Sequence, residues 1–239
     1  MPLPFPPEGY SEDIVRRVRV LFNGEYVVDA SVPKLVWERP FYPLYYFHQK
    51  DVQMKYLLNG KADGTHDIVV HDRTAPGGAT TFSSGPFKGM VRITFSAADA
   101  WFEESERIHA HPKDPYKRIH ILESAKHVRV EIDGVEVANT THPKLLYETG
   151  LPVRTYIPHT DVRLELLRPS DLTTSCPYKG DANYYKIRLP SGEKDGLIWW
   201  YKTPTAESAA ITGRVAFYDE KVDVWVDGVK QERPVTPFS

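Results

Sequence analysis

Several features are scarce in this chain of 239 residues, and each scarcity excludes a class of protein. The single cysteine, Cys176, excludes an intrachain disulfide and a multi-cysteine zinc site. No apolar run approaches the roughly 20 residues of a membrane helix, and the first residues lack the pattern of a signal peptide. The counts of Lys plus Arg (30) and Asp plus Glu (32) leave no basic surplus for nucleic acid or an anionic membrane. We therefore expect a cytoplasmic protein that contacts neither.

Helical periodicity and phosphate-binding loops are scarce as well. Residues 161–167 and 205–210 have the pattern of one or two helical turns, which is shorter than a usual helix. The chain contains neither a Gly-x-x-x-x-Gly-Lys-Ser/Thr loop nor a Gly-x-Gly-x-x-Gly loop. We therefore predict no organic cofactor, and the expected partner is a small-molecule ligand. The oligomeric state is left open.

An internal repeat determines the expected organisation. Residues 18–24 (Val-Arg-Val-Leu-Phe-Asn-Gly) resemble residues 128–134 (Val-Arg-Val-Glu-Ile-Asp-Gly), 110 positions later. The same offset pairs Pro33-Lys34-Leu35 with Pro143-Lys144-Leu145, Glu38 with Glu148, Tyr46 with Tyr156, and Asp51-Val52 with Asp161-Val162. A long match at one offset indicates a tandem duplication. We predict a diverged N-terminal module at residues 14–112, a connector at 113–123 and a C-terminal module at 124–236.

Both modules have the sequence pattern of β proteins. Asn23-Gly24 and Asp133-Gly134 are strong signals for two-residue hairpin turns. Residues 128–133 alternate apolar and polar side chains, as a strand with one dry face does. The predicted fold is mainly β, with two small modules in tandem and short helical turns.

The densest polar and aromatic segment surrounds the only cysteine. Lys179 follows Cys176 by three residues, and a lysine near a thiol favours the reactive thiolate. Cys176 is therefore a candidate nucleophile. The alternative is a small buried residue beside a tight turn, since free cysteines are usually buried.

The segments of the second module resemble the domain-of-unknown-function family 427, sometimes labelled nucleotidyltransferase-like. The resemblance is carried by residues 142–152 (His-Pro-Lys-Leu-Leu-Tyr-Glu-Thr-Gly-Leu-Pro), Tyr156, residues 161–163, residues 169–171, Cys176-Pro-Tyr-Lys-Gly180, residues 213–218 and residues 222–225. Residues 100–104 and 111–118 resemble the connector of the tandem form of that family. The resemblance implies a compact fold of the β-tent kind and implies no settled activity.

The first module departs from this pattern where the second has Cys-Pro-Tyr-Lys-Gly. That region of the first module contains His66, Asp67, His71 and Asp72, and His109 and His111 follow later. A metal site is one interpretation of these residues. His66 and His71 would lie on opposite faces of a regular strand, however, and no pair of cysteines accompanies them. We therefore predict no metal ligand, and a structural role for His111.

The predicted site combines carboxylates, the motif residues and aromatic side chains. Glu38 and Glu148 occupy equivalent positions, each four residues after a lysine, and a buried carboxylate serves as a general acid or base. A surface ion pair with Lys34 or Lys144 is the alternative. The candidate catalytic residues are Glu148, Cys176, Lys179 and Glu38. The candidate substrate-binding residues are Tyr156, Arg154, Tyr178, Tyr185, Trp200 and Tyr46.

These residues support one leading function and two alternatives. The leading hypothesis is a small-molecule enzyme without an organic cofactor, with acid and base chemistry in a polar, aromatic pocket. The first alternative is a non-catalytic module that binds a small ligand or another molecule. The second is nucleotidyl transfer, which requires paired acidic residues around two divalent metals.

Overall fold

Both predicted hairpin turns are present and have the left-handed backbone that such turns require. The φ angles are 46° at Asn23 and 81° at Gly24, and 50° at Asp133 and 77° at Gly134. The turns join β2 (Val18–Phe22) to β3 (Glu25–Ala30) and β13 (Val128–Ile132) to β14 (Val135–Thr140). The structure is a computed structural model that describes residues 5–236.

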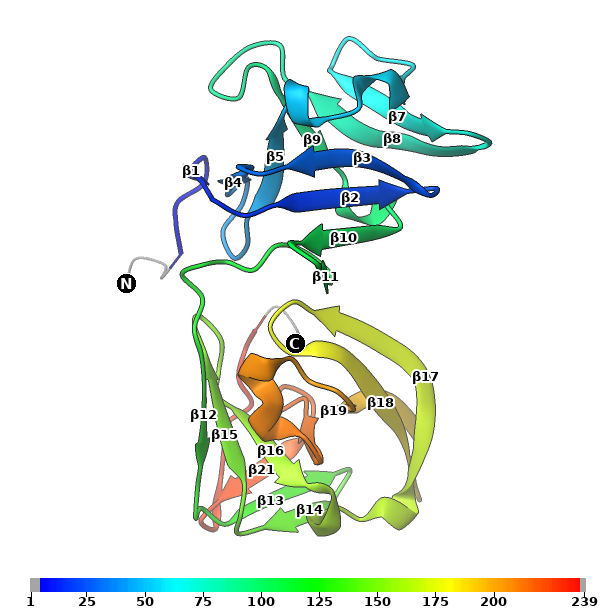
Figure 1. The fold of residues 1–239 in the computed structure, drawn as a ribbon. Coiled ribbons are helices and arrows are strands. Elements are labelled where there is room, and N and C mark those ends of the chain that lie inside the picture. The colour runs from blue at the N-terminus through cyan, green and yellow to red at the C-terminus, as the bar shows by residue number, and fades with distance from the viewer. Residues whose placement is uncertain (1–4, 237–239) are drawn as a thin grey trace. The chain divides into compact units, whose positions relative to one another are not determined.

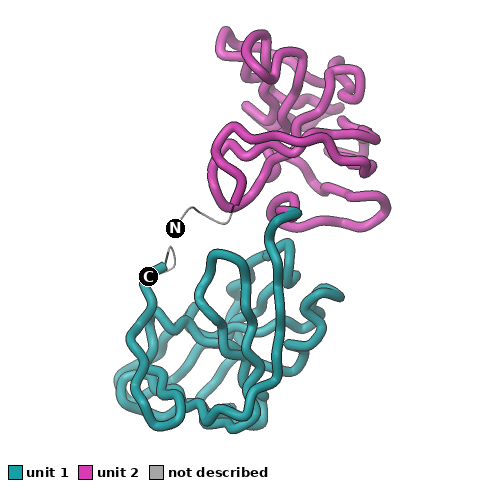
Figure 2. The backbone as a smooth tube through the Cα atoms, turned by 90° about the vertical axis from the view of Figure 1, so that its left-hand side faces the viewer, with its two compact units in different colours: residues 1–4, 115–239 teal, residues 5–114 magenta. Residues whose placement is uncertain are grey.

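The chain divides into two units after Asp114. Residues 5–114 form the N-terminal unit, and the described residues from Pro115 onward form the C-terminal unit (Figure 2). Each unit contains one seven-stranded and one four-stranded antiparallel sheet (Figure 1). The prediction of two mainly β modules in tandem is confirmed.

The seven-stranded sheet of the N-terminal unit is built around a central group of longer strands. Its order is β1 (Ser11–Asp13), β4 (Lys34–Val36), β5 (Leu44–His48), β9 (Met90–Ile93), β8 (Arg73–Thr81), β7 (Thr65–Val70) and β6 (Leu57–Leu58). The four-stranded sheet has the order β11 (Glu106–Ile108), β10 (Ala100–Glu103), β2 and β3.

The C-terminal unit repeats this topology strand for strand. Its seven-stranded sheet has the order β12 (Ile119–Glu123), β15 (Lys144–Glu148), β16 (Arg154–Pro158), β20 (Arg214–Phe217), β19 (Gly192–Tyr201), β18 (Gly180–Leu189) and β17 (Leu167–Cys176). Its four-stranded sheet has the order β14, β13, β21 (Asp223–Val226) and β22 (Val229–Lys230).

Small irregularities recur at the same places in both units. A register shift follows Val20 in the first unit and Val130 in the second. Isolated bridges join Val28 to Val52 and Ala138 to Val162, again 110 residues apart. Repetition of a bulge and of a bridge shows that the two halves of the duplication fold alike.

The helical elements are short 3-10 turns. They are η1 (Gln49–Asp51), η2 (Met54–Tyr56), η3 (Phe95–Ala97), η4 (His159–Asp161), η5 (Leu164–Leu166) and η6 (Ala206–Ile211). The last three cover the segments in which helical turns are predicted from the sequence. No helix in the described part of the chain has the length and apolar character needed to cross a membrane.

The first strand of each seven-stranded sheet lies outside the predicted module limits. Strand β1 ends at Asp13, before residue 14, and β12 lies within the predicted connector 113–123. Both are edge strands that pair only with β4 and β15, respectively. A short edge strand has a weak sequence signal because only one side of its backbone is paired.

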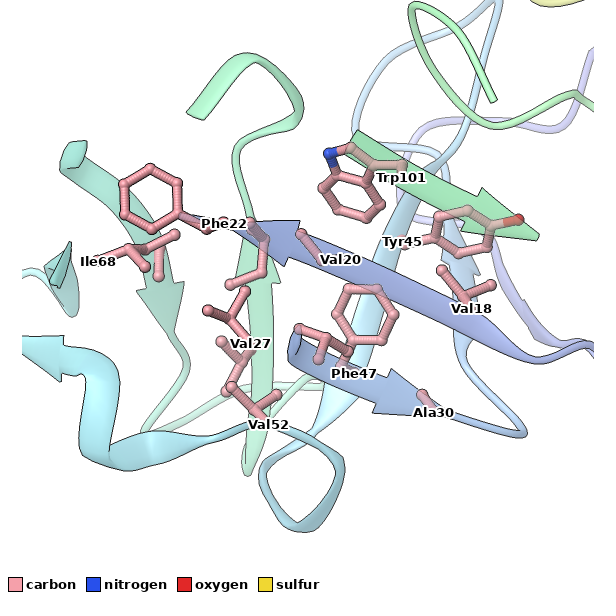
Figure 3. Packing of buried hydrophobic residues seen from close by; sticks show 14 of the residues in the cluster. Val18, Val20, Phe22, Val27, Ala30, Tyr45, Phe47, Val52, Ile68 and Trp101 are labelled. Carbon is pink, nitrogen blue, oxygen red and sulfur yellow. The ribbon is translucent and has the colours of Figure 1, made fainter. Parts of the chain in front are cut away.

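An inner core fills the space between the two sheets of each unit. In the N-terminal unit, Val18 and Val20 of β2 lie near the rings of Phe47 and Trp101, and Phe22 lies beside Ile68 (Figure 3). The corresponding side chains of the C-terminal unit, Val128, Val130 and Ile132, are also buried. Burial of such a side chain contributes about 1.5–3 kcal/mol to stability.

The other side of each seven-stranded sheet, called here the outer face, is covered as well. In the N-terminal unit, Val36, Tyr46 and Met90 form a second cluster with Phe82 and Phe87. The C-terminal unit has a larger outer cluster, consisting of Leu146, Tyr156, Ala182, Tyr184, Trp199, Tyr201, Ile211 and Ala216. Because side chains alternate along a strand, each central strand contributes to both clusters.

Replacement of Trp101 tests the inner core. Trp101 is 2% exposed, so Trp101→Ala leaves a cavity, and we expect a loss of about 3–5 kcal/mol in the free energy of unfolding of the N-terminal unit. Chemical denaturation followed by circular dichroism measures the loss. Val15→Ala is the control, because Val15 is 94% exposed and its replacement removes little buried area. A loss below about 1 kcal/mol in Trp101→Ala would contradict this packing.

Candidate functional site

The outer face of the C-terminal sheet brings four predicted residues together. Glu148 is the last residue of β15, Tyr156 lies in β16, and Cys176 is the last residue of β17. Lys179 follows in the turn before β18, where Cys176 pairs with Gly180. Glu148 faces the same side as Leu146 of the outer cluster, because the two residues are two positions apart.

Glu148 is held between two lysines. Its Oε1 atom lies 3.0 Å from Nζ of Lys117, and its Oε2 atom accepts a hydrogen bond from Nζ of Lys179. The side chains of Glu148, Lys117 and Lys179 are only 5%, 12% and 13% exposed. The expected surface pair with Lys144 is not formed, since Lys144 pairs with Glu123 instead. The three groups form a buried ion triad with one excess positive charge.

The triad determines which protonation states are populated. Burial raises the pKa of Glu148, but Lys179 and Lys117 outweigh burial and hold this pKa below its usual range. Burial lowers the pKa of Lys179, but Cys176 and Glu148 outweigh burial and hold this pKa above its usual range. At neutral pH the carboxyl group is therefore ionised, and Glu148 has no proton to donate.

The Tyr156 hydroxyl is a buried polar group of this cluster whose hydrogen bonding is incomplete. The side chain is fully buried, and its hydroxyl has no hydrogen-bond acceptor among the described residues. Burial raises the pKa of Tyr156 to about 12, and the charge of Lys179 and the indole N–H of Trp199 oppose that rise. The phenol is therefore protonated at neutral pH and has a donor available for a further group.

The turn that carries Lys179 is fixed through its backbone. The carbonyl oxygen of Tyr178 accepts hydrogen bonds from Oγ1 of Thr205 (2.5 Å) and Oγ of Ser208 (3.1 Å). Gly180 has a φ of +98°, and a Cβ atom there would lie 3.3 Å from the carbonyl oxygen of Thr203. Helix η6, drawn in orange in Figure 1, thus anchors the Cys-Pro-Tyr-Lys-Gly turn. The buried Tyr178 ring lies 5.1 Å from Nζ of Lys117.

Arg154 faces the same side as Tyr156 but binds other carboxylates. Its guanidinium donates to Glu220 and, at 3.3 Å, to Asp219. The same group lies over the Trp199 and Tyr218 rings, at 5.6 and 5.8 Å from their centroids. Arg154 therefore belongs to a second charged cluster on this unit.

Two predicted aromatic residues lie on the opposite face of the sheet. Tyr185 and Trp200 stack with ring centroids 5.7 Å apart, beside His159 and against the inner core. Their neighbours Tyr184 and Trp199 belong to the outer cluster. A one-residue step along a strand reverses the direction of the side chain, so Tyr185 and Trp200 do not join Glu148.

The equivalent site in the N-terminal unit is closed. Glu38 accepts hydrogen bonds from the Tyr46 hydroxyl and from Arg92, both at 2.5 Å. The rings of Phe82 and Phe87 lie 5.0 and 4.9 Å from the Tyr46 ring. In the C-terminal unit, two lysines pair with Glu148 and the Tyr156 hydroxyl has no acceptor among the described residues. In the N-terminal unit, the Tyr46 hydroxyl has an acceptor, and two aromatic rings pack against the Tyr46 ring.

The histidines of the first module do not converge. His66 contacts the Thr81 hydroxyl at 3.0 Å, whereas His71 is exposed near Glu25. His111 stacks on Tyr42, with ring centroids 4.2 Å apart. Across residues 5–236, no three His, Cys, Asp or Glu side chains are grouped so that they could hold a metal ion.

A surface depression reaches Glu148 from the solvent. Its volume is about 350 Å³, and it is lined by Arg118, His120, Tyr147, Glu148, Thr149 and Leu151. Lys117 and Arg118 were not predicted as site residues from the sequence. The only available signal was their place in the connector motif, and motif membership alone does not show that Lys117 reaches a carboxylate more than 30 residues away.

Comparison with known proteins assigns most of the chain to a family. The model of a family described as "Domain of unknown function (DUF427)" matches residues 11–68 and 120–228, which is more than half of the chain. The match to the first copy ends at residue 68, within the region that lacks Cys-Pro-Tyr-Lys-Gly. No curated protein matches the chain.

Replacement of Glu148 tests the buried triad. Glu148→Gln leaves two lysines without their partner, and we expect a loss of about 3–5 kcal/mol in the free energy of unfolding at pH 7. The folded-state pKa of Glu148 is lowered, so its contribution is present above the unfolded pKa and is lost as pH falls through the folded value. Acid should therefore destabilise the wild type more than Glu148→Gln.

Denaturation curves between pH 7 and pH 3 measure both effects. Glu123→Gln is the matched control, because Glu123 pairs with a lysine of the same sheet but is 84% exposed, and its replacement should change stability by less than about 1 kcal/mol. Equal losses in the two variants would refute a buried triad.

Proposed function

The chain belongs to the DUF427 family, and we propose that it is a small-molecule enzyme without an organic cofactor. Its active site is the outer face of the C-terminal sheet, around Glu148, Tyr156, Cys176 and Lys179. The family description names no activity, so the proposal rests on the chemistry of these side chains.

The observation that carries the proposal is the unpaired Tyr156 hydroxyl. A buried polar group without a hydrogen bond costs about 1–3 kcal/mol, so such groups are rare unless they have a role. The equivalent Tyr46 donates to Glu38. Tyr156 instead lies beside protonated Lys179, where a substrate oxygen would accept from both groups.

The proposed roles follow from the protonation states. Tyr156 donates a hydrogen bond or a proton to a substrate oxygen, and Lys179 stabilises the negative charge that develops there. Glu148 holds Lys179 in place rather than moving protons, because two lysines keep it ionised. Cys176 is the remaining candidate nucleophile, at the end of β17.

A non-catalytic binding module is the second candidate, and one observation favours it. Both equivalent glutamates are paired, Glu148 with two lysines and Glu38 with Arg92 and Tyr46, so neither is a free base. Nucleotidyl transfer is less well supported, because that chemistry requires carboxylates that bind divalent cations. Glu148 binds ammonium groups instead.

A ligand screen with matched variants tests the proposal. Small carboxylates and phosphates are screened by thermal shift, and each ligand that stabilises the wild type is incubated and recovered for NMR. Tyr156→Phe and Lys179→Met should bind such a ligand about 10- to 100-fold more weakly, because each loses a hydrogen bond to a charged group. Tyr46→Phe, the equivalent change in the N-terminal unit, should bind as the wild type does.

Chemical change of the recovered ligand distinguishes an enzyme from a binding module. We expect conversion by the wild type and by Tyr46→Phe, and none by Tyr156→Phe. Recovery of every ligand unchanged would favour the binding module. Equal binding by all four proteins would exclude this face as the site.

A further inference from the structure

A second cavity lies in the C-terminal unit, on the other side of its seven-stranded sheet. Its volume is about 270 Å³. Its wall includes Val128 and Val224 of the four-stranded sheet, Val222 just before β21, Thr155 of β16 and Val153 just before β16. Residues 231–234 form a further part of the wall. The cavity is thus mostly apolar and lies between the two sheets.

The N-terminal unit has aromatic rings at the equivalent positions. Strand register aligns Tyr45 with Thr155 and Trp101 with Val224. The second residue after β9 is Phe95, and the second after β20 is Asp219. In the N-terminal unit these rings pack together, with Phe95 and Trp101 4.9 Å apart and Tyr45 and Trp101 6.3 Å apart. Figure 3 shows Tyr45 and Trp101 in this core.

The exchange of three rings for smaller side chains leaves open space in an otherwise equivalent scaffold. Thr155, Val224 and Asp219 all line the cavity of the C-terminal unit. Protein interiors are normally close-packed, and an open volume next to a charged group is typical of a ligand site.

Asp219 gives the cavity its electrostatic character. Its Oδ2 atom lies 3.3 Å from Arg154, whose other ion pair is with the buried Glu220. Two carboxylates therefore share one guanidinium. Oε2 of Glu220 is buried and has no hydrogen-bond partner among the described residues. The group carries one excess negative charge when both carboxyls are ionised.

We propose that this cavity binds a small molecule with an apolar body and a cationic amine head. The valine-lined wall accommodates the apolar part, and the ammonium group pairs with Asp219. This site is distinct from the one around Tyr156, and it does not depend on the function proposed there.

The protonation of Asp219 adds a pH dependence to this binding. Burial raises the pKa of Asp219 to about 6, Arg154 opposes that rise, and Glu220 adds to it. Other charged groups at the cavity are Lys126, Glu232 and Arg233, and Arg233 is paired with Asp223 at 2.9 Å. An ammonium ligand binds the ionised carboxylate, so affinity falls as pH drops through about 6.

The test uses n-hexylamine as the probe and hexanoate as its counterpart of opposite charge. Calorimetric titration of the full chain at pH 7.5 should show binding of hexylamine and at least tenfold weaker binding of hexanoate. At pH 5 the affinity for hexylamine should fall roughly tenfold, because about one tenth of Asp219 remains ionised. Asp219→Asn should bind weakly at both pH values.

Variants that refill the cavity locate the binding. Val224→Trp introduces the ring that the N-terminal unit has at this position and should abolish binding of hexylamine. Thr155→Tyr is an independent filling variant, should Val224→Trp not fold. Val229→Trp is the control, because Val229 is 64% exposed in the same sheet, and it should bind as the wild type does.

Three outcomes would overturn the proposal. One is the absence of hexylamine binding at millimolar concentration. Another is a preference for hexanoate, which would show that Lys126 and Arg233 determine the charge selectivity. The third is wild-type affinity in a folded filling variant, which would place the amine elsewhere.

Discussion

Both faces of each seven-stranded sheet are covered, so successive side chains of one strand belong to two different clusters. This constraint decides which functional groups can meet. Tyr156 and Trp199 face the outer cluster, while their neighbours Ile157 and Trp200 face the inner core. A sheet with one solvated face would have no buried outer side on which Glu148 and its lysines could be desolvated.

The two units have the same strand topology but differ in the packing between their sheets and in the hydrogen bonds on the outer face. In the N-terminal unit, rings fill the space between the sheets, and Glu38, Tyr46 and Arg92 satisfy one another on the outer face. In the C-terminal unit, a cavity of about 270 Å³ remains beside the inner core, and the Tyr156 hydroxyl has no acceptor among the described residues. We infer that the C-terminal unit carries the function and that the N-terminal copy has been optimised for packing.

Local and repeated signals made most of the fold predictable. The hairpin turns, the alternation in residues 128–133 and the constant offset identify strands and duplication without any long-range information. The family resemblance, now confirmed, directed attention to Glu148 and Lys179, which do meet. The sequence predicts a connector where edge strand β12 lies, because a strand whose backbone is paired on one side only has a weak sequence pattern.

The remaining site residues depend on contacts that no local pattern encodes. Lys117 reaches Glu148 because β12 pairs with β15, and that register is not visible in the sequence. Asp219 contacts Arg154, which precedes it by 65 residues. Tyr185 is on the inner side because its neighbour Tyr184 faces the outer cluster, and the sequence alone does not show which of these two residues faces which side. The most direct test of the account is a high-resolution crystal structure that resolves the surroundings of the Tyr156 hydroxyl. The account predicts an ordered water or ligand within about 3 Å of this oxygen that also contacts Lys179. A hydrogen bond from Tyr156 to an acceptor of the protein itself would contradict it.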